Sequence, residues 1–108
     1  MKEHKMNDTI TVAKTIRQQI TLDAWLAVSA RNPENDGGDL VFRFGRAGGN
    51  KRHIRVHLNP LDLYDVYVTS TQVRSGPNWM KVTDVARYVN VYADTLAELV
   101  RSINHNHG

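Results

Sequence analysis

Residues 53–68 read HIRVHLNPLDLYDVYV, two alternating stretches separated by an Asn-Pro corner. Apolar side chains occupy every second position of both stretches, at 54, 56 and 58 and again at 64, 66 and 68. A period of two indicates strands with one buried face. Pro60 cannot donate to a strand ladder, so the first strand ends there. Asn59 and Asp62 suit the corner, because their short side chains bond nearby backbone amides.

The alternation continues on the N-terminal side of this stretch. Leu40, Phe42 and Phe44 alternate with polar or smaller residues, which predicts a strand over 40–44 and a glycine-rich hairpin turn over 45–52. The run RNPENDGGD at 31–39 is rich in Pro, Gly, Asn and Asp, residues that interrupt helices and strands, so we expect a loop there. The short apolar run 25–30 is predicted to be another strand, in which Trp25 could face either way.

Helices are expected at both ends of the chain. Isoleucine and alanine recur at helical spacing between Ile10 and Ile20, which predicts a helix over 9–21. A turn at 75–78 is predicted to lead into a fifth strand over 79–85, which continues with a bulge to Tyr88. Asn90 is expected to cap the last helix, and Asp94 to lie in its first turn, where the helix dipole favours an anion. Its buried face comprises Val91, Leu96, Leu99, Val100 and Ile103.

These elements predict an α+β fold. Short connections favour an antiparallel meander of four or five strands, with the N- and C-terminal helices packed on one face. We expect one domain over 9–104 between flexible tails at 1–8 and 105–108.

The composition narrows the class of protein. The 108 residues suffice for one modest core, and the net charge of +3 is small. There is no cysteine, which excludes disulfides, thiolate nucleophiles and cysteine zinc sites. No apolar run approaches the roughly 18 residues of a membrane span, and the first residues lack a signal-peptide core. We therefore expect a cytoplasmic protein without membrane contact.

Four segments resemble a widespread group of small uncharacterised proteins of phages, prophages and plasmids. The segments are WLAVSARN at 25–32, LVFRFG at 40–45, IRVHLNPLDLYDVYV at 54–68 and VYADTL at 91–96. The distinctive motifs resemble LNxxDLYDVxF and GVYADxL, and the resemblance covers roughly 12–103. Two departures are Thr21-Leu22, where relatives carry Gly-Gly, and the ending after Ile103. The resemblance implies a mobile-element origin and no particular activity, because the group has no established function.

A basic hairpin is the best candidate for a binding site. The segment 43–57 holds five Lys or Arg side chains and no Asp or Glu. If the apolar positions of its strands face the core, the basic positions face solvent, where they suit phosphate contact. Trp79 and Tyr67 would offer surfaces for base stacking on the same face. The alternative is a merely solvated face, since exposed strands favour Lys and Arg. The expected contact residues are Arg43, Arg46, Lys51, Arg52, Arg55, His57 and Trp79.

Catalytic and metal sites are not indicated. Asp62, Asp65 and Asp94 have structural explanations as a corner residue, a polar strand position and a helix start. His53 and His57 would lie about 13 Å apart on one strand, too far to share a metal, and His105 and His107 fall in an expected tail. No nucleophile elbow, phosphate-binding loop or metalloprotease motif occurs. We therefore expect a protein that is not an enzyme and uses no cofactor.

Three kinds of binding remain as hypotheses. The first is a nucleic-acid-associated role through phosphate contacts of the basic hairpin. The second is a small inhibitor or adaptor that binds a host protein, such as a component of a defence system. The third is self-association through an exposed strand edge.

Overall fold

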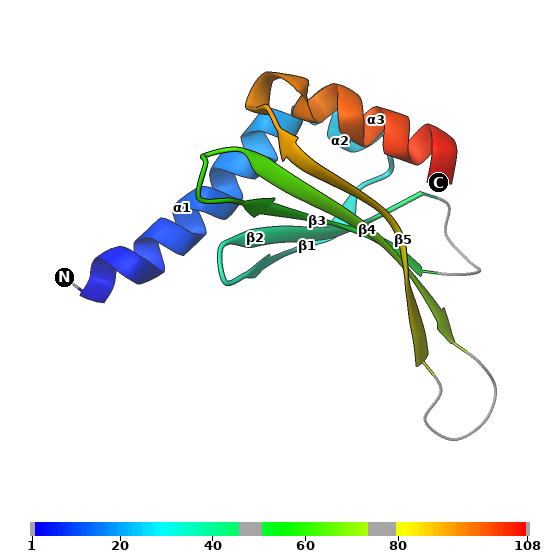
Figure 1. The fold of residues 1–108 in the computed structure, drawn as a ribbon, viewed down its shortest axis with the longest axis horizontal. Helices are drawn as coiled ribbons and strands as arrows, with labels where there is room; N and C mark the ends of the chain where they lie inside the picture. Colours follow the sequence, from blue (N-terminus) through cyan, green and yellow to red (C-terminus); the bar gives the residue numbers. More distant parts are fainter. Residues whose placement is uncertain (1, 46–50, 74–79, 108) are drawn as a thin grey trace.

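The computed structural model describes residues 2–45, 51–73 and 80–107. Its strands form one five-stranded antiparallel sheet in the order β1-β2-β3-β4-β5, so each strand pairs with its neighbour in sequence (Figure 1). Three helices cover one face of this meander, and the other face lacks a covering element among the described residues (Figure 1). The α+β prediction is confirmed, including the meander and the terminal helices.

The first strand of the sheet is not the predicted one. Residues 25–30 were expected to be a strand, but Leu22–Ala27 forms a short helix, α2. The Thr21 hydroxyl accepts a hydrogen bond from the Ala24 amide at 3.3 Å and caps this helix. Ala24, Trp25 and Val28 are buried, which is a helical spacing. The apolar run therefore packs as one turn and a half of helix instead of an extended strand.

Strand β1 is Arg31–Asp36, inside the segment expected to be a loop. Its side chains are mostly exposed and polar, so it has no buried face that a sequence pattern could reveal. Gly37 and Gly38 both have positive φ angles, 60° and 96°, and make the tight turn into β2, Asp39–Phe44. The predicted loop is thus a hairpin with a polar edge strand.

Strands β3, Lys51–Leu58, and β4, Tyr64–Val73, follow the prediction closely. Lys51 and Arg52 belong to β3, whereas the predicted turn extended to 52; the rest of that turn, 46–50, lies outside the described residues. Strand β5 is Met80–Val91, longer than predicted. Its register against β4 shifts between Val68 and Thr69, which confirms the expected bulge. The predicted turn at 75–78 lies outside the described residues.

Both terminal helices extend further toward the ends of the chain than expected. Helix α1 is Lys2–Ile20, although its start was expected near residue 9, and α3 is Leu96–His107, so most of the expected C-terminal tail is helical. A 3₁₀ turn, η1 at Ala93–Thr95, precedes α3 and contains Asp94 in its first turn. The prediction that Asn90 caps the last helix is wrong, because Asn90 is part of β5. Tyr92 precedes η1 instead, without a side-chain cap.

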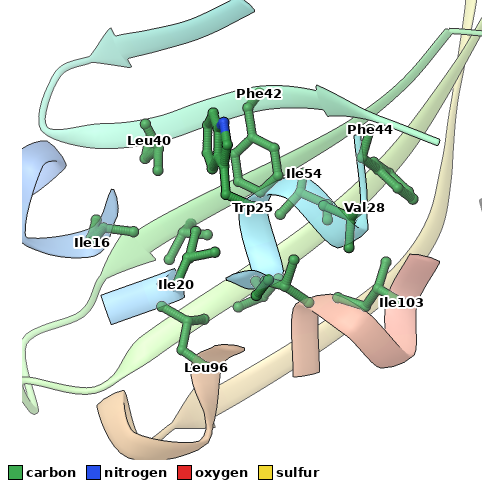
Figure 2. Close-up of a cluster of buried hydrophobic side chains, with 14 of the residues drawn as sticks. Ile16, Ile20, Trp25, Val28, Leu40, Phe42, Phe44, Ile54, Leu96 and Ile103 are labelled. Atoms are coloured by element: carbon green, nitrogen blue, oxygen red, sulfur yellow. The ribbon is translucent and has the colours of Figure 1, made fainter. Parts of the chain in front are cut away.

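The core lies between the helices and the inner face of the sheet (Figure 2). Phe42 and Phe44 from β2 meet Ile54 from β3, and Trp25 lies tilted against Phe42 with 4.8 Å between ring centroids. The helices and the residue that caps α2, Val28, contribute a matching set of fully buried side chains, which otherwise comprises Ile16, Ile20, Leu96, Val100 and Ile103. The opposite face of the same strands consequently carries the polar residues.

Candidate functional site

The β2–β3 hairpin presents its basic side chains on the face away from the helices, as predicted. Phe42 pairs with Ile54, and both are fully buried. Arg43 pairs with His53, and Val41 with Arg55, on the opposite face. The neighbours on β4 in this outer face are Thr69, opposite His53, and Tyr67, opposite Arg55. The alternation therefore fixes the facing of the candidate site.

The structure engages two of the predicted contact residues internally. Arg55 forms ion pairs with Asp36 at 2.6 Å and Asp39 at 2.8 Å, and His57 Nδ1 lies 2.7 Å from a carboxylate oxygen of Asp39. The hydrogen bond to Asp36 is the main reason that the pKa of Arg55 is raised above its ordinary value. Phosphate would have to compete with these carboxylates. Asp36 and Asp39 thus already engage Arg55, and Asp39 engages His57, which the sequence analysis did not anticipate.

The acids come from a part of the chain that was treated as a loop. Asp36 ends β1 and Asp39 begins β2, and the hairpin turn between them sets both carboxylates beside β3. Asp39 lies two positions before Val41 on β2, so the two side chains point to the same face. Val41 pairs with Arg55, and Asp39 therefore shares the outer face with Arg55. Extending the alternation of β2 backward by one step would have placed Asp39 on that face.

Cationic side chains gather at the other end of the hairpin, which we call the basic end. It consists of Arg31, Arg43 and Lys51 on the outer face and of Arg52, which pairs with Phe44 and so lies on the helix-facing side of the same strand end. Arg31 pairs in register with Arg43, and its guanidinium donates to the carbonyl oxygens of Ser29 at 2.8 Å and Gly45 at 2.9 Å. These bonds hold Arg31, which the sequence analysis missed, at the hairpin end.

The cations of the basic end have no acidic partner within the described part of the chain. The salt bridges there join Arg55 and His57 to their aspartates, and none includes the four residues of the basic end. Nε of Arg43 is buried and has no hydrogen-bond partner in those residues. Arg46 and Trp79, both predicted contact residues, lie outside the described residues.

The pKa of His53 indicates that the electrostatic potential at the basic end is positive. Burial lowers the pKa of His53 below its ordinary value, and the nearby charges of Arg43 and Lys51 lower it further, against a smaller opposing effect of Glu34. The lowered pKa favours the neutral imidazole, so His53 carries less positive charge than a free histidine at the same pH. An anion bound here would meet a positive potential.

The corner residues form a hydrogen-bonded network that fixes the β3–β4 connection. The Asn59 side-chain oxygen accepts from the amides of Leu61 at 2.9 Å and Leu63 at 3.2 Å. Its amide group donates to Asp65 at 3.1 Å and to Asn90 at 3.0 Å, and Asn59 itself is buried. This is the predicted corner role of Asn59. The exposed Pro60 follows it, and Asp62 adopts a left-handed φ of 59°.

The aspartates considered for chemistry have separate structural settings. Asp65 accepts from the backbone amide of Asn90 at 3.1 Å, and this bond is the main reason that its pKa is lowered. Asp62 lies in the corner, and Asp94 in η1. Within residues 2–45, 51–73 and 80–107, no group of three His, Asp or Glu side chains is placed to hold a metal ion.

An open surface hollow of about 550 Å³ lies between α1 and the first hairpin and is lined by residues that include Ala13, Arg17, Pro33 and Leu40. Arg17 covers the Trp25 ring there, with its guanidinium carbon 3.9 Å from the ring centroid.

Comparisons with protein-family models, curated proteins and solved structures found no match. The resemblance to phage-encoded proteins therefore stays a prediction. No helix of the described chain is both long and apolar enough to cross a bilayer.

Proposed function

We propose that this protein is a small non-enzymatic binding protein that contacts the phosphate backbone of a nucleic acid through its basic end. The observation that carries the proposal is the clustering of Arg31, Arg43, Lys51 and Arg52 at one hairpin end, where the described residues offer no carboxylate partner. Contacts to phosphate depend on charge more than on base identity, so we expect little sequence preference.

The position of the basic end suits an extended polyanion. Lys51 is exposed and begins β3, Arg43 lies on the adjacent strand β2, and Arg31 lies on β1, one strand further out. Beyond them on the outer face, Tyr67 lies next to Arg87, whose guanidinium carbon is 5.8 Å from the ring centroid. A nucleic-acid strand that extends from the basic end toward β4 would contact the cationic side chains first and then the aromatic ring of Tyr67.

A protein partner is the second candidate function. It is favoured by the mixed charge of the outer face, where Asp36, with 63% of its side chain exposed, lies at the end opposite the basic end. A face with separated charges of both signs suits a complementary protein surface better than a uniform polyanion. With the mobile-element origin that the resemblance implies, the proposed partner is a host protein, and the chain acts as its inhibitor or adaptor.

Neutralising one cation at a time tests the nucleic-acid proposal. Lys51→Gln removes an exposed cation of the basic end, and we expect affinity for a mixed-sequence oligonucleotide to fall about three- to tenfold, with a weaker salt dependence. Arg55→Gln removes the same charge from the same strand, but Arg55 is already held by Asp36 and Asp39. We expect this matched variant to bind within about twofold of wild type. Fluorescence anisotropy at about 50 and 200 mM salt measures both.

Two results would contradict the proposal. One is the absence of binding by the wild-type chain to single and double strands at low salt. The other is an equal loss of affinity in the two variants, since that would place the contact on the whole face instead of the basic end. A nuclease-treated pull-down that retains one stoichiometric protein would then favour the second candidate.

The pH titration of His53 gives an independent test. Its pKa is lowered in the free protein by burial and by Arg43 and Lys51. A phosphate beside those side chains stabilises the imidazolium, so we expect the pKa of His53 to rise when an oligonucleotide binds. NMR of the imidazole protons measures the shift, and an uncharged nucleic-acid analogue serves as control. An unchanged titration at saturation would place the bound strand away from the basic end.

A further inference from the structure

Strand β5 is a long open edge of the sheet. It runs over twelve residues, Met80–Val91, and pairs with β4 alone among the described strands (Figure 1). The backbone groups on its outer side are therefore free to pair with another strand. The opposite edge, β1, is half as long and contains Pro33, features that hinder strand addition.

Apolar side chains are exposed along β5. Val82 is 59% exposed, Val85 39% and Val89 50%. Such residues on an unprotected edge strand are unusual for a monomer, because they invite pairing with a second strand. An exposed hollow of about 310 Å³ lies beside them and is lined by Tyr67, Asp84, Val85, Ala86 and Arg87.

The β5 bulge places two opposite charges on the same face. Asp84 pairs with Thr69, and Arg87 pairs with Tyr67, two positions along β4. Residues three apart on a regular strand point to opposite faces, but the extra residue at the bulge restores Asp84 and Arg87 to one side. Val82 shares that face through its pairing with Thr71. Val89, which follows the core-packed Tyr88, is exposed beyond Arg87.

Val82, Asp84, Arg87 and Val89 follow one another along β5, with the bulge in the middle. This order is complementary to itself when it is read in the opposite direction. When two β5 strands run antiparallel with their bulges facing, each Asp84 lies opposite the partner's Arg87, and each Val82 lies opposite the partner's Val89. Opposite charges and apolar pairs that face each other across strands are stabilising. A two-fold axis at the bulge repeats every contact, as an isologous dimer requires. No described salt bridge occupies Asp84 or Arg87.

We infer that two copies of this chain associate through their β5 edges and continue the meander into one sheet, in the register set by Asp84 and Arg87. The occupant of this edge is a second copy, because the charges and valines of β5 complement themselves. The contact area of one strand edge is small, so we expect a dissociation constant of roughly micromolar order.

Charge reversal tests the register. Asp84→Arg alone and Arg87→Asp alone each oppose like charges twice in the dimer, so we expect either to weaken dimerisation about tenfold or more. The double variant restores opposite charges with exchanged positions, and we expect its dissociation constant to return to within about threefold of wild type. Analytical ultracentrifugation without nucleic acid measures all four proteins, and circular dichroism confirms that each is folded.

Cysteine cross-linking gives a second measurement on a chain that has no native cysteine. The Val82→Cys/Val89→Cys variant brings two thiols opposite each other across the dimer, so we expect oxidation to yield a covalent dimer. The Val82→Cys/Thr83→Cys variant carries the same number of thiols out of register and keeps Asp84 and Arg87, and we expect it to stay largely uncross-linked.

The inference is overturned if the wild-type chain stays monomeric up to about 1 mM, well above micromolar dissociation constants. It is also overturned if the double charge variant associates no better than the single ones, or if both cysteine pairs cross-link equally. These measurements involve neither the basic end nor an oligonucleotide, so their outcome is independent of the proposed function.

Discussion

Phe42→Ala is expected to lower the free energy of unfolding by about 3–5 kcal/mol, the range for a phenylalanine removed from a closed core. Phe42 is fully buried in the middle of β2, against Trp25 from α2 and opposite Ile54 of β3 (Figure 2). Its loss leaves a cavity between the sheet and the helices. Small domains have about 5–15 kcal/mol of stability in total, so the variant would keep only part of it.

Urea unfolding followed by circular dichroism measures this loss. Val41→Ala is the matched control, because Val41 is the preceding residue of β2 but lies half-buried on the outer face. We expect the control to lose less than about 1 kcal/mol. Similar losses in both variants would contradict the assignment of the two faces, and with it the position of the basic end.

Asn59→Ala is expected to cost about 2–4 kcal/mol, although it removes only one small polar side chain. Asn59 is buried and makes four hydrogen bonds, two to backbone amides of its own corner and two to the side chains of Asp65 and Asn90. The substitution leaves these groups with fewer partners where water has little access. It also loosens the junction between β4 and β5, because Asn90 belongs to β5.

Pro60→Ala is the control for the corner. Pro60 is the next residue and is exposed, so its substitution removes little more than local stiffness, worth under about 1 kcal/mol. Equal destabilisation by the two changes, measured in the same urea titration, would show that the corner depends on backbone stiffness instead of the Asn59 network.

The parts of the fold that followed from sequence are those in which one face of a strand is buried. Residues 40–44, 54–58 and 64–68 alternate between core and solvent, and a two-residue period leaves a visible pattern. Helix α3 was foreseen for the same reason, because its buried residues recur at helical spacing. When one side of a strand or helix packs against the core, its apolar residues recur at the period of that element, so the local sequence reveals the contact.

The remaining elements depend on partners that lie far away in the sequence. Two apolar side chains of α2, Leu22 and Leu26, are 62% and 66% exposed. Apolar character in this region therefore did not indicate which side chains are buried, and the run 25–30 was wrongly predicted to be a strand. Strand β1 is polar on both faces and exists because β2 offers it a ladder and Gly37-Gly38 a tight turn. Composition could not distinguish it from a loop.

The sequence predicted correctly which face of the sheet carries the basic side chains of β2 and β3. It did not predict the carboxylates that balance part of their charge. The segment 43–57 contains no acid, but Arg55 is neutralised by Asp36 and Asp39, which lie 19 and 16 positions earlier in the chain. Strand register brings these charges together, and it depends on the β1–β2 hairpin that was not expected. The same hairpin adds Arg31 to the basic end.

The outer face thus has Asp36 and Asp39 at one end of the strands and Arg31, Arg43 and Lys51 at the other. This separation gives the molecule an electric dipole roughly along the strand direction. A charged surface exerts a torque on such a dipole before any contact is made, so encounters occur with one end leading, and added salt weakens this orientation. Most collisions with a negatively charged body would then begin at the end where β3 starts.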